Sequence, residues 1–185
     1  PDLVTPYVHS KTPEFRLQML RADVDHIDGV LITHNHADHI HGFDDLRQFT
    51  LLNGESVPVY GSPATMDWLK DHFSYIWNAS QKGGGLPKVS LKPVENSFYL
   101  GGVMFTPIPV KHGSLDVYGY RVGKMAYISD VSYIPEASMD LLDGIDLLII
   151  DAVRYKPHET HFHLDAAVEV ARSLGVRRTL LTHLG

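Results

Sequence analysis

The segment THNHADH, residues 33–39, places three histidines and an aspartate directly after a short apolar run. An apolar run of this kind is typical of a buried strand, so these side chains stand where a strand is expected to end. His34 and His36 are two residues apart, and in an extended backbone their side chains project to the same side. Asp38 and His39 follow where the chain is expected to turn into a helix. The segment therefore predicts a loop with four ligand-type side chains at the end of a strand.

Strands and helices alternate in the first part of the sequence. The run Val57–Tyr60 favours a strand. Ser62 and Pro63 are typical of the N-cap and the first position of a helix, which is expected to continue to about Tyr75. Together with the strand before the histidine-rich segment, this order predicts a βαβα-like opening.

The middle of the sequence is richer in strands. Two turn signals, Gly101-Gly102 and Gly123-Lys124, separate apolar runs and predict hairpins. We therefore expect the strands of this region to pair in antiparallel fashion. They cover residues 89–94, 98–100, 103–110, 117–122 and 125–129.

The last third of the sequence returns to alternating elements. We expect a short helix near Pro135–Leu142, a strand over Asp146–Ile150, a helix over Leu164–Ser173 that ends before Gly175, and a strand over Thr179–Thr182. The whole pattern predicts the α/β (α+β) class, with mixed sheets covered by helices.

The composition limits the number of domains. The chain has 185 residues, and 44% of them are hydrophobic, which is enough for one sizeable core. The glycine-rich stretch Gln81–Gly85 predicts a flexible loop, and no stretch has the character of a domain linker. We expect a single domain over residues 1–185.

Charge and cysteine content exclude several kinds of function. The formal net charge is -6 and no cluster of Lys and Arg offsets it, so no long nucleic acid is expected as a partner. There are no cysteines, so any metal must be held by nitrogen and oxygen. We find neither a signal-peptide pattern nor an apolar stretch long enough for a bilayer, and we expect a cytoplasmic protein without a membrane partner.

Three further ligand-type residues stand at the ends of expected strands. They are His112, Asp130 and His183. Loops at one rim of a sheet sandwich can converge on a single pocket. Because the histidine-rich segment already offers two pairs of ligands, the pattern predicts a site with two metal ions.

Residues 34–39, HNHADH, resemble the HxHxDH signature of the metallo-β-lactamase superfamily, and His112, Asp130 and His183 match the family's remaining ligand positions in chain order. The similarity is closest to the phosphodiesterase branch, which includes the ring-opening cyclic phosphodiesterase of phosphonate metabolism and, more distantly, tRNase Z. The resemblance implies a four-layer αββα sandwich with the site at one edge. It rests on THNHADHIHGFDDLR (residues 33–47), SDVS (129–132) and HFHLDAAVEVA (161–171).

The resemblance also implies how the ligands are shared between two divalent ions. Zinc and manganese both suit nitrogen and oxygen ligands, and iron is a further alternative for the two ions. Asp130 would bridge the two ions, because its two carboxylate oxygens can each bind a different cation. The first metal would be held by His34, His36 and His112, and the second by Asp38, His39 and His183.

The sequence departs from the family's pattern at its ends. Only 33 residues precede the first motif histidine, where the family usually has a pair of strands, and the chain stops two residues after His183. Whether terminal elements of the sandwich are lacking stays open.

Other residues are candidates for catalysis or substrate binding. His161 precedes the helix expected from Leu164, and the resemblance implies that it enters the pocket and protonates the leaving group. Asp38 is counted with it as a catalytic residue. His41 and Arg154 are the candidates for substrate binding.

The predicted function is that of a binuclear hydrolase that cleaves a small phosphodiester with a metal-bridging hydroxide. Cyclic and nucleotide-like diesters are included among the small-molecule substrates. Two alternatives stay open: a thioester or lactone hydrolase of the glyoxalase II type, and a non-catalytic metal-binding accessory protein. A homodimer also stays open.

Overall fold

The structure is a computed structural model, and it describes residues 14–78 and 85–185. The chain divides into two compact units. Unit 1 comprises Pro1–Glu95 with Leu100–Gly102, and unit 2 comprises Asn96–Tyr99 with Val103–Gly185. That residues 1–185 form a single domain stays a prediction.

Unit 1 contains a sheet of three parallel strands in the order β1-β2-β3. β1 (Val30–Leu31) pairs with β2 (Val57–Gly61), which in turn pairs with β3 (Val89–Pro93). The other elements of the unit are helical: α1 (Phe15–Arg21), α2 (Ala37–Ile40), η1 (Phe43–Leu46), α3 (Arg47–Asn53), α4 (Pro63–His72) and η2 (Ser74–Ile76).

The predicted start of α4 is confirmed in detail. The Ser62 hydroxyl accepts a hydrogen bond from the Thr65 N–H at 3.2 Å, and Pro63 stands in the first turn. The helix ends at His72, a little before the expected Tyr75, and the chain continues as the 3-10 segment η2.

The predicted pairing of β3 is wrong. We expected it to join the antiparallel strands, but it runs parallel to β2, with Val59 opposite Leu91. The physical reason is the helix between them: α4 carries the chain back along the sheet, and a crossover of this kind joins parallel strands. The predicted loop at Gln81–Gly85 lies, except for Gly85, outside the described residues.

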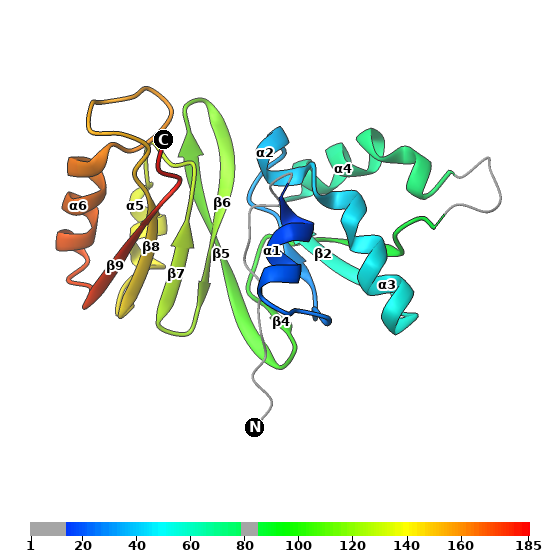
Figure 1. Cartoon of the computed structure of the whole chain (residues 1–185). Coiled ribbons are helices and arrows are strands. Elements are labelled where there is room, and N and C mark those ends of the chain that lie inside the picture. Colours follow the sequence, from blue (N-terminus) through cyan, green and yellow to red (C-terminus); the bar gives the residue numbers. More distant parts are fainter. Residues whose placement is uncertain (1–13, 79–84) are drawn as a thin grey trace. The chain divides into compact units, whose positions relative to one another are not determined.

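Unit 2 contains a mixed sheet of six strands in the order β4-β5-β6-β7-β8-β9, of which only Leu100, at the end of β4, is counted with unit 1. β5, β6 and β7 pair in antiparallel fashion as predicted, whereas β7, β8 and β9 are parallel. Figure 1 shows α6 alongside β8 and β9. The elements are β4 (Phe98–Leu100), β5 (Val103–His112), β6 (Leu115–Val122), β7 (Met125–Ile128), α5 (Glu136–Asp140), β8 (Leu147–Asp151), α6 (Leu164–Ser173) and β9 (Arg178–Thr182).

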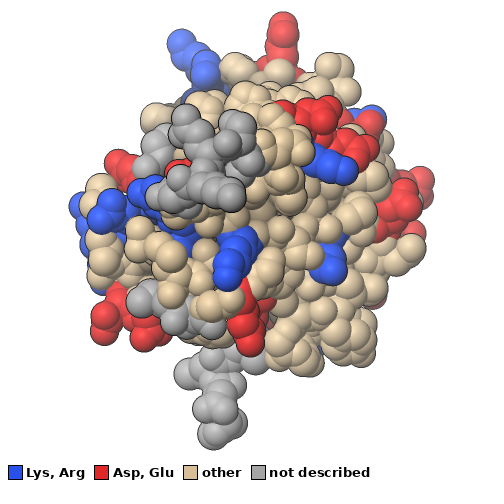
Figure 2. All heavy atoms as spheres, turned by 90° about the vertical axis from the view of Figure 1, so that its right-hand side faces the viewer, with Lys and Arg blue, Asp and Glu red and all other residues tan. Residues whose placement is uncertain are grey.

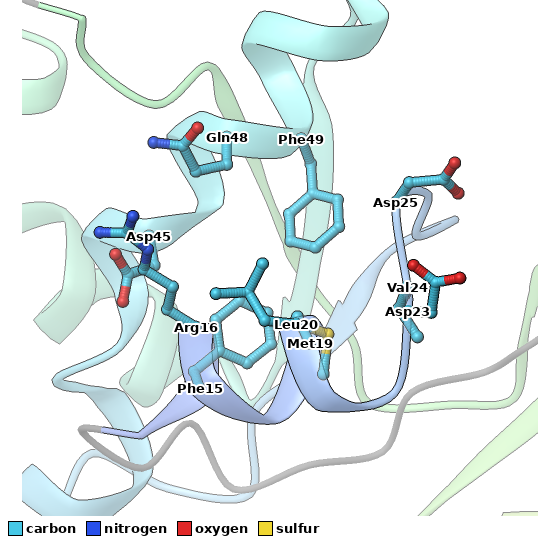
Figure 3. Close-up of a pocket in the computed structure, with 10 residues that line it drawn as sticks. All are labelled: Phe15, Arg16, Met19, Leu20, Asp23, Val24, Asp25, Asp45, Gln48 and Phe49. Atoms are coloured by element: carbon cyan, nitrogen blue, oxygen red, sulfur yellow. The ribbon is translucent and has the colours of Figure 1, made fainter.

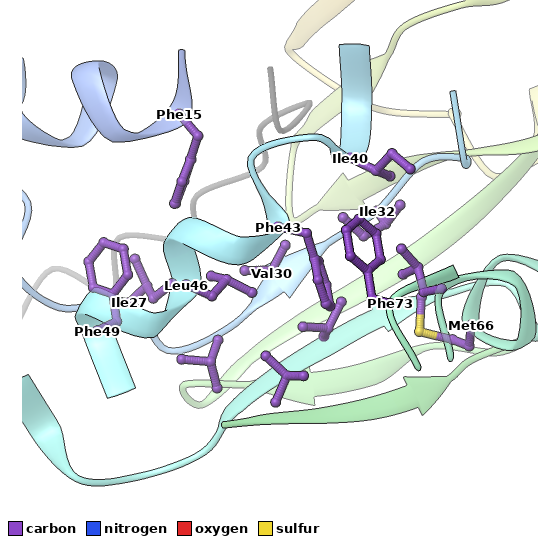
Figure 4. Packing of buried hydrophobic residues seen from close by; sticks show 14 of the residues in the cluster. Phe15, Ile27, Val30, Ile32, Ile40, Phe43, Leu46, Phe49, Met66 and Phe73 are labelled. Carbon is purple, nitrogen blue, oxygen red and sulfur yellow. The ribbon is translucent and has the colours of Figure 1, made fainter. Parts of the chain in front are cut away.

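Each unit has its own hydrophobic core. In unit 1, Ile40 and Phe43 follow the histidine-rich segment and are fully buried. The ring of Phe43 packs against that of Phe73 with 4.9 Å between centroids (Figure 4). Full burial of one such side chain contributes about 1.5–3 kcal/mol. The core therefore fixes α2, and with it the side chains of the histidine-rich segment, onto the sheet of unit 1.

The core of unit 2 includes residues at and just beyond the strand ends. Ile128, Val131 and Ile150 are fully buried there, and Phe162 packs against the same cluster.

None of the helices in the described ranges combines the length and the apolar character that a bilayer-spanning helix needs.

Candidate metal centre

The predicted ligands divide between the two units. Unit 1 carries His34, His36, Asp38 and His39 on one continuous segment. Unit 2 carries the others, which come from separate strand ends: His112, Asp130 and His183.

In unit 1, the backbone changes from strand to helix within the histidine-rich segment. The Ile32 N–H donates to the Tyr60 carbonyl at 2.8 Å, which continues the ladder beyond β1. His36 is still extended, with φ -69° and ψ 151°, and is the N-cap of α2. The prediction that Asp38 and His39 belong to the first turn of a helix is confirmed.

The side chains of this segment gather around His34. Its ring centroid lies 4.5 Å from that of His36 and 4.2 Å from that of His39. The Thr33 hydroxyl lies 3.1 Å from His34 Nδ1, and such a contact fixes the orientation of the ring. His39 Nε2 is 3.3 Å from Asp38 Oδ2. Three imidazoles and a carboxylate thus offer several donor atoms within a small volume.

In unit 2, four polar side chains stand at the same edge of the sheet. β5 and β7 both run antiparallel to β6, and β8 and β9 run parallel to β7, so the carboxyl ends of β5, β7, β8 and β9 share one edge. The residues at or just beyond these ends are His112, Asp130, Asp151 and His183.

His112 is buried and has a defined tautomer. Its Nδ1 lies 2.6 Å from the carbonyl oxygen of Thr160. A carbonyl can only accept, so Nδ1 carries the proton and Nε2 keeps the lone pair that a metal ion needs. Imidazole ligands in metal sites are commonly oriented in this way.

Asp130 is the most central carboxylate of unit 2. It is only 2% exposed. Its Oδ1 lies 2.9 Å from His183 Nε2 and 3.9 Å from His161 Nδ1. Asp130 and His183 also share an uncommon backbone conformation, with φ 55° and 56°. Residues with a Cβ enter this left-handed region rarely, although Asp and His do so more often than most, and strained backbone clusters at functional sites.

His161 is held by a carboxylate that sequence reasoning did not assign to the site. Its Nδ1 lies 2.9 Å from Oδ2 of Asp151, which is fully buried and also accepts a hydrogen bond from the Val131 N–H at 3.2 Å. Burial raises the pKa of the Asp151 carboxyl, although the hydrogen bond and the charge of His161 lower it in part. The available signal was an aspartate at the end of an apolar strand, LLIID.

The imidazole of His161 is surrounded by other rings. Its centroid lies 4.5 Å from His112, 5.2 Å from His183 and 5.4 Å from His158. Ligand-type atoms of His112, Asp130 and His161 all lie within 4.8 Å of one another. The distances alone therefore allow His161 as a ligand, but its Nδ1 is already engaged by Asp151.

The donor atoms fit a divalent cation. Two ligands of one tetrahedral ion, each about 2.0–2.1 Å from it, lie about 3.3 Å apart. The Asp38–His39 pair has 3.3 Å between oxygen and nitrogen, and the Asp130–His183 pair has 2.9 Å. The first spacing matches that distance, and the second is shorter and also has the length of a direct hydrogen bond.

The remaining candidates are more peripheral. His41 is exposed at the C-cap of α2. Arg154 is exposed, and its carbonyl accepts from the Leu164 N–H. His163 is the N-cap of α6 but its side chain makes no capping hydrogen bond. Substrate binding by His41 and Arg154 stays a prediction.

A separate pocket of about 260 Å³ lies in unit 1 (Figure 3). Its apolar part is formed by Phe15, Met19, Leu20 and Phe49, and carboxylates such as Asp25 stand at its margin. It includes none of the predicted ligands or catalytic residues.

The family of the chain follows from comparison with known proteins. Residues 1–184 match the family described as the beta-lactamase superfamily domain. The chain belongs to the metallo-β-lactamase superfamily, and the sandwich class predicted from the sequence is confirmed. The two sheets and their helices are the elements of that fold.

Solved structures support the same assignment. A diphosphatase from the PhnP family is 42% identical, with a TM-score of 0.84 over 94% of this chain and 66% of that chain. Human tRNase Z, short form, shares the fold at 17% identity, with a TM-score of 0.72 over 94% of this chain and 79% of that chain. The likeness to the PhnP family supports the phosphodiesterase branch that the motifs predicted.

A curated relative is much longer than this chain. It is an octanoyltransferase from Porphyromonas gingivalis (strain ATCC BAA-308 / W83), 32% identical over 176 residues. These residues make up 94% of this chain but only 35% of that protein. The chain thus spans about a third of this relative and about two thirds of the PhnP-family diphosphatase.

Proposed function

We propose that the chain is a metal-dependent hydrolase of small phosphodiesters, and that its two sets of ligands together bind two divalent ions, zinc, manganese or iron. When bound, two such ions lower the pKa of a shared water and stabilise negative charge on a phosphoryl oxygen. Family membership supports the proposal, since the superfamily's signature motif and its later ligands are all present in this chain.

The observation that carries the proposal is the pair formed by His161 and Asp151 next to Asp130. The Asp151 carboxylate accepts a hydrogen bond from the Nδ1–H of His161, which directs Nε2 of the same ring away from Asp151. An imidazole held in this way can deliver a proton to a leaving oxygen. Hydrolysis of an alkyl or ribose diester depends on such a proton because an alkoxide is a poor leaving group.

Diphosphates are included in the proposed substrate class. The PhnP-family relative is a diphosphatase. Hydrolysis of a substituted diphosphate, like that of a diester, cleaves a P–O bond, and the leaving group is then a phosphate. A phosphate leaving group needs protonation less than an alkoxide does, so the same residues would serve both reactions with different dependence on His161.

We propose that the substrate is a small molecule and not a long nucleic acid. Long polynucleotides are bound through grouped cations. On the face shown in Figure 2, Lys and Arg side chains stand among Asp and Glu side chains, and neither sign covers a continuous area. The net charge of -6 points the same way.

One observation favours a second candidate function. The relative from Porphyromonas gingivalis is an octanoyltransferase, and acyl transfer resembles the thioester hydrolysis that the sequence left open. Since only 35% of that protein matches, we include acyl thioesters as competitors in the substrate comparison.

The first prediction concerns substrate choice. With Mn²⁺ or Zn²⁺, kcat/KM for bis(p-nitrophenyl) phosphate, a 2′,3′-cyclic nucleotide or a substituted diphosphate is expected to exceed that for a glutathione thioester, a lactone and a β-lactam by orders of magnitude. Phosphate monoesters should be poor substrates because none of the pockets found in the described residues is lined mainly by cations that would match their extra charge. A thioester that outperforms every phosphate ester would make thioester hydrolysis the function.

The second prediction concerns metal content. Protein prepared without chelator should contain about two Mn, Zn or Fe ions per chain, because the ligand set suffices for two sites. Elemental analysis measures this, and dialysis against a chelator should abolish activity until metal returns. Less than about one ion per chain after reconstitution would contradict the binuclear proposal.

A further inference from the structure

Three consecutive residues connect three strand ends of unit 2. The Thr160 carbonyl accepts from His112 at the end of β5. His161 pairs with Asp151 at the end of β8. The Phe162 N–H donates to the Val131 carbonyl, just beyond β7. Segment 160–162 therefore contacts a predicted metal ligand with its first residue and carries the predicted proton donor as its second.

Thr160 is held in place by two neighbours that have no assigned role. Its N–H donates to His158 Nδ1 at 3.3 Å, and its hydroxyl lies 3.2 Å from the same nitrogen. Because Nδ1 accepts the N–H, the Thr160 hydroxyl can contact it only as a donor, and the two donors share the one lone pair of this nitrogen. On the other side, Gly113 leaves room for Thr160: a Cβ at Gly113 would lie 2.9 Å from Thr160 Cγ2.

We propose that Thr160 is a positioning residue for the metal centre, and that His158 and Gly113 fix it for this task. The inference rests on the proposed function, since it assigns His112 as a ligand. Thr160 would contact neither metal nor substrate. Its carbonyl sets the tautomer and the angle of the His112 ring, and its neighbours set the position of that carbonyl.

The size of the effect follows from the behaviour of similar groups. Removing a hydrogen-bond partner of a metal-bound histidine typically weakens metal affinity or activity about 10–100-fold. His158 is exposed, so its replacement removes little packing. The loss should therefore appear in metal affinity, while thermal stability changes little.

The experiment separates the two anchors of Thr160. His158→Ala removes the acceptor, and Thr160→Val removes the hydroxyl but keeps a methyl group against Gly113. Thr160→Ser keeps the hydroxyl, and Glu159→Ala is the matched control in the same exposed loop. Affinity for Zn²⁺ is measured by competition with a chelator, and unfolding temperature is recorded for each variant.

We expect His158→Ala to weaken Zn²⁺ binding about 10-fold or more. Thr160→Val should bind Zn²⁺ more weakly than the wild type, and Thr160→Ser should have nearly the affinity of the wild type. Glu159→Ala should bind like the wild type. Equal affinities in all variants would overturn the proposal, and so would losses that parallel the unfolding temperature. A wild-type protein that binds no metal would instead overturn the proposed function.

A second measurement does not depend on any variant. In the metal-free wild-type protein, nitrogen NMR should find the His112 proton on Nδ1, as the contact with the Thr160 carbonyl requires. His158→Ala should give a mixture of both tautomers. A proton on Nε2 in the wild type would overturn the proposal even if every variant failed to fold.

Discussion

Asp130→Ala is expected to release both metal ions and to abolish hydrolysis. If this carboxylate bridges the ions, its removal takes a ligand from each of them, and the loss in metal affinity should exceed the roughly 100-fold effect known for groups that only orient a ligand. His39→Ala removes a ligand from one ion and should retain the other. Elemental analysis and kcat/KM of the two variants, prepared side by side, measure the difference.

The backbone at Asp130 calls for a further control. Alanine at φ 55° is strained, whereas asparagine tolerates the left-handed region. Asp130→Asn therefore keeps the shape and the backbone of the wild type but offers a neutral amide. It should fold normally and still lose metal. Equal, mild losses in Asp130→Ala and His39→Ala would show that Asp130 is not shared.

His161→Ala is expected to slow cleavage of alkyl and ribose esters far more than cleavage of p-nitrophenyl esters. General acid catalysis typically contributes about 10² to 10⁴ in rate, and a good leaving group such as p-nitrophenolate needs little of it. Metal content should stay at the wild-type level. The rates of the two substrates are compared at saturating metal.

The hydrogen bond to Asp151 provides a matched test of the same role. Asp151→Asn should slow the poor leaving group as well, and the double variant should be no slower than His161→Ala alone, because both changes act through one imidazole. Equal slowing of both substrates, or loss of metal from His161→Ala, would give His161 a different role. Its closeness to His112 and Asp130 makes the metal analysis decisive.

The sequence predicted the positions of the candidate ligands well because strand ends are visible in it. An apolar run followed by His, Asp or Ser-Asp indicates that a strand ends there and that a polar side chain lies at its end. His112, for example, is the last residue of β5. Asp151 ends a similar run and was missed as a site residue. Its partner His161 is ten positions away along the chain, and no motif or spacing in the sequence predicts the contact between the two side chains.

The elements were predicted better than their partners. Helix α6 has the predicted bounds, Leu164–Ser173. The direction of β3 was wrong, because the antiparallel pattern of the following strands was extended to a strand that a helix precedes. α1 and α3 were not predicted, because each has only seven residues, which is too short for a clear helical period. Phe15 and Met19 become recognisable as a buried face only once the rest of unit 1 is present.

The backbone conformation of Asp130 and His183 also affects the stability of the chain. At φ 55° and 56°, glycine would fold there with less strain than either residue. A carboxylate and an imidazole at these two places therefore lower the stability of the fold relative to glycine. Such a cost is expected at positions that serve chemistry and not only the fold.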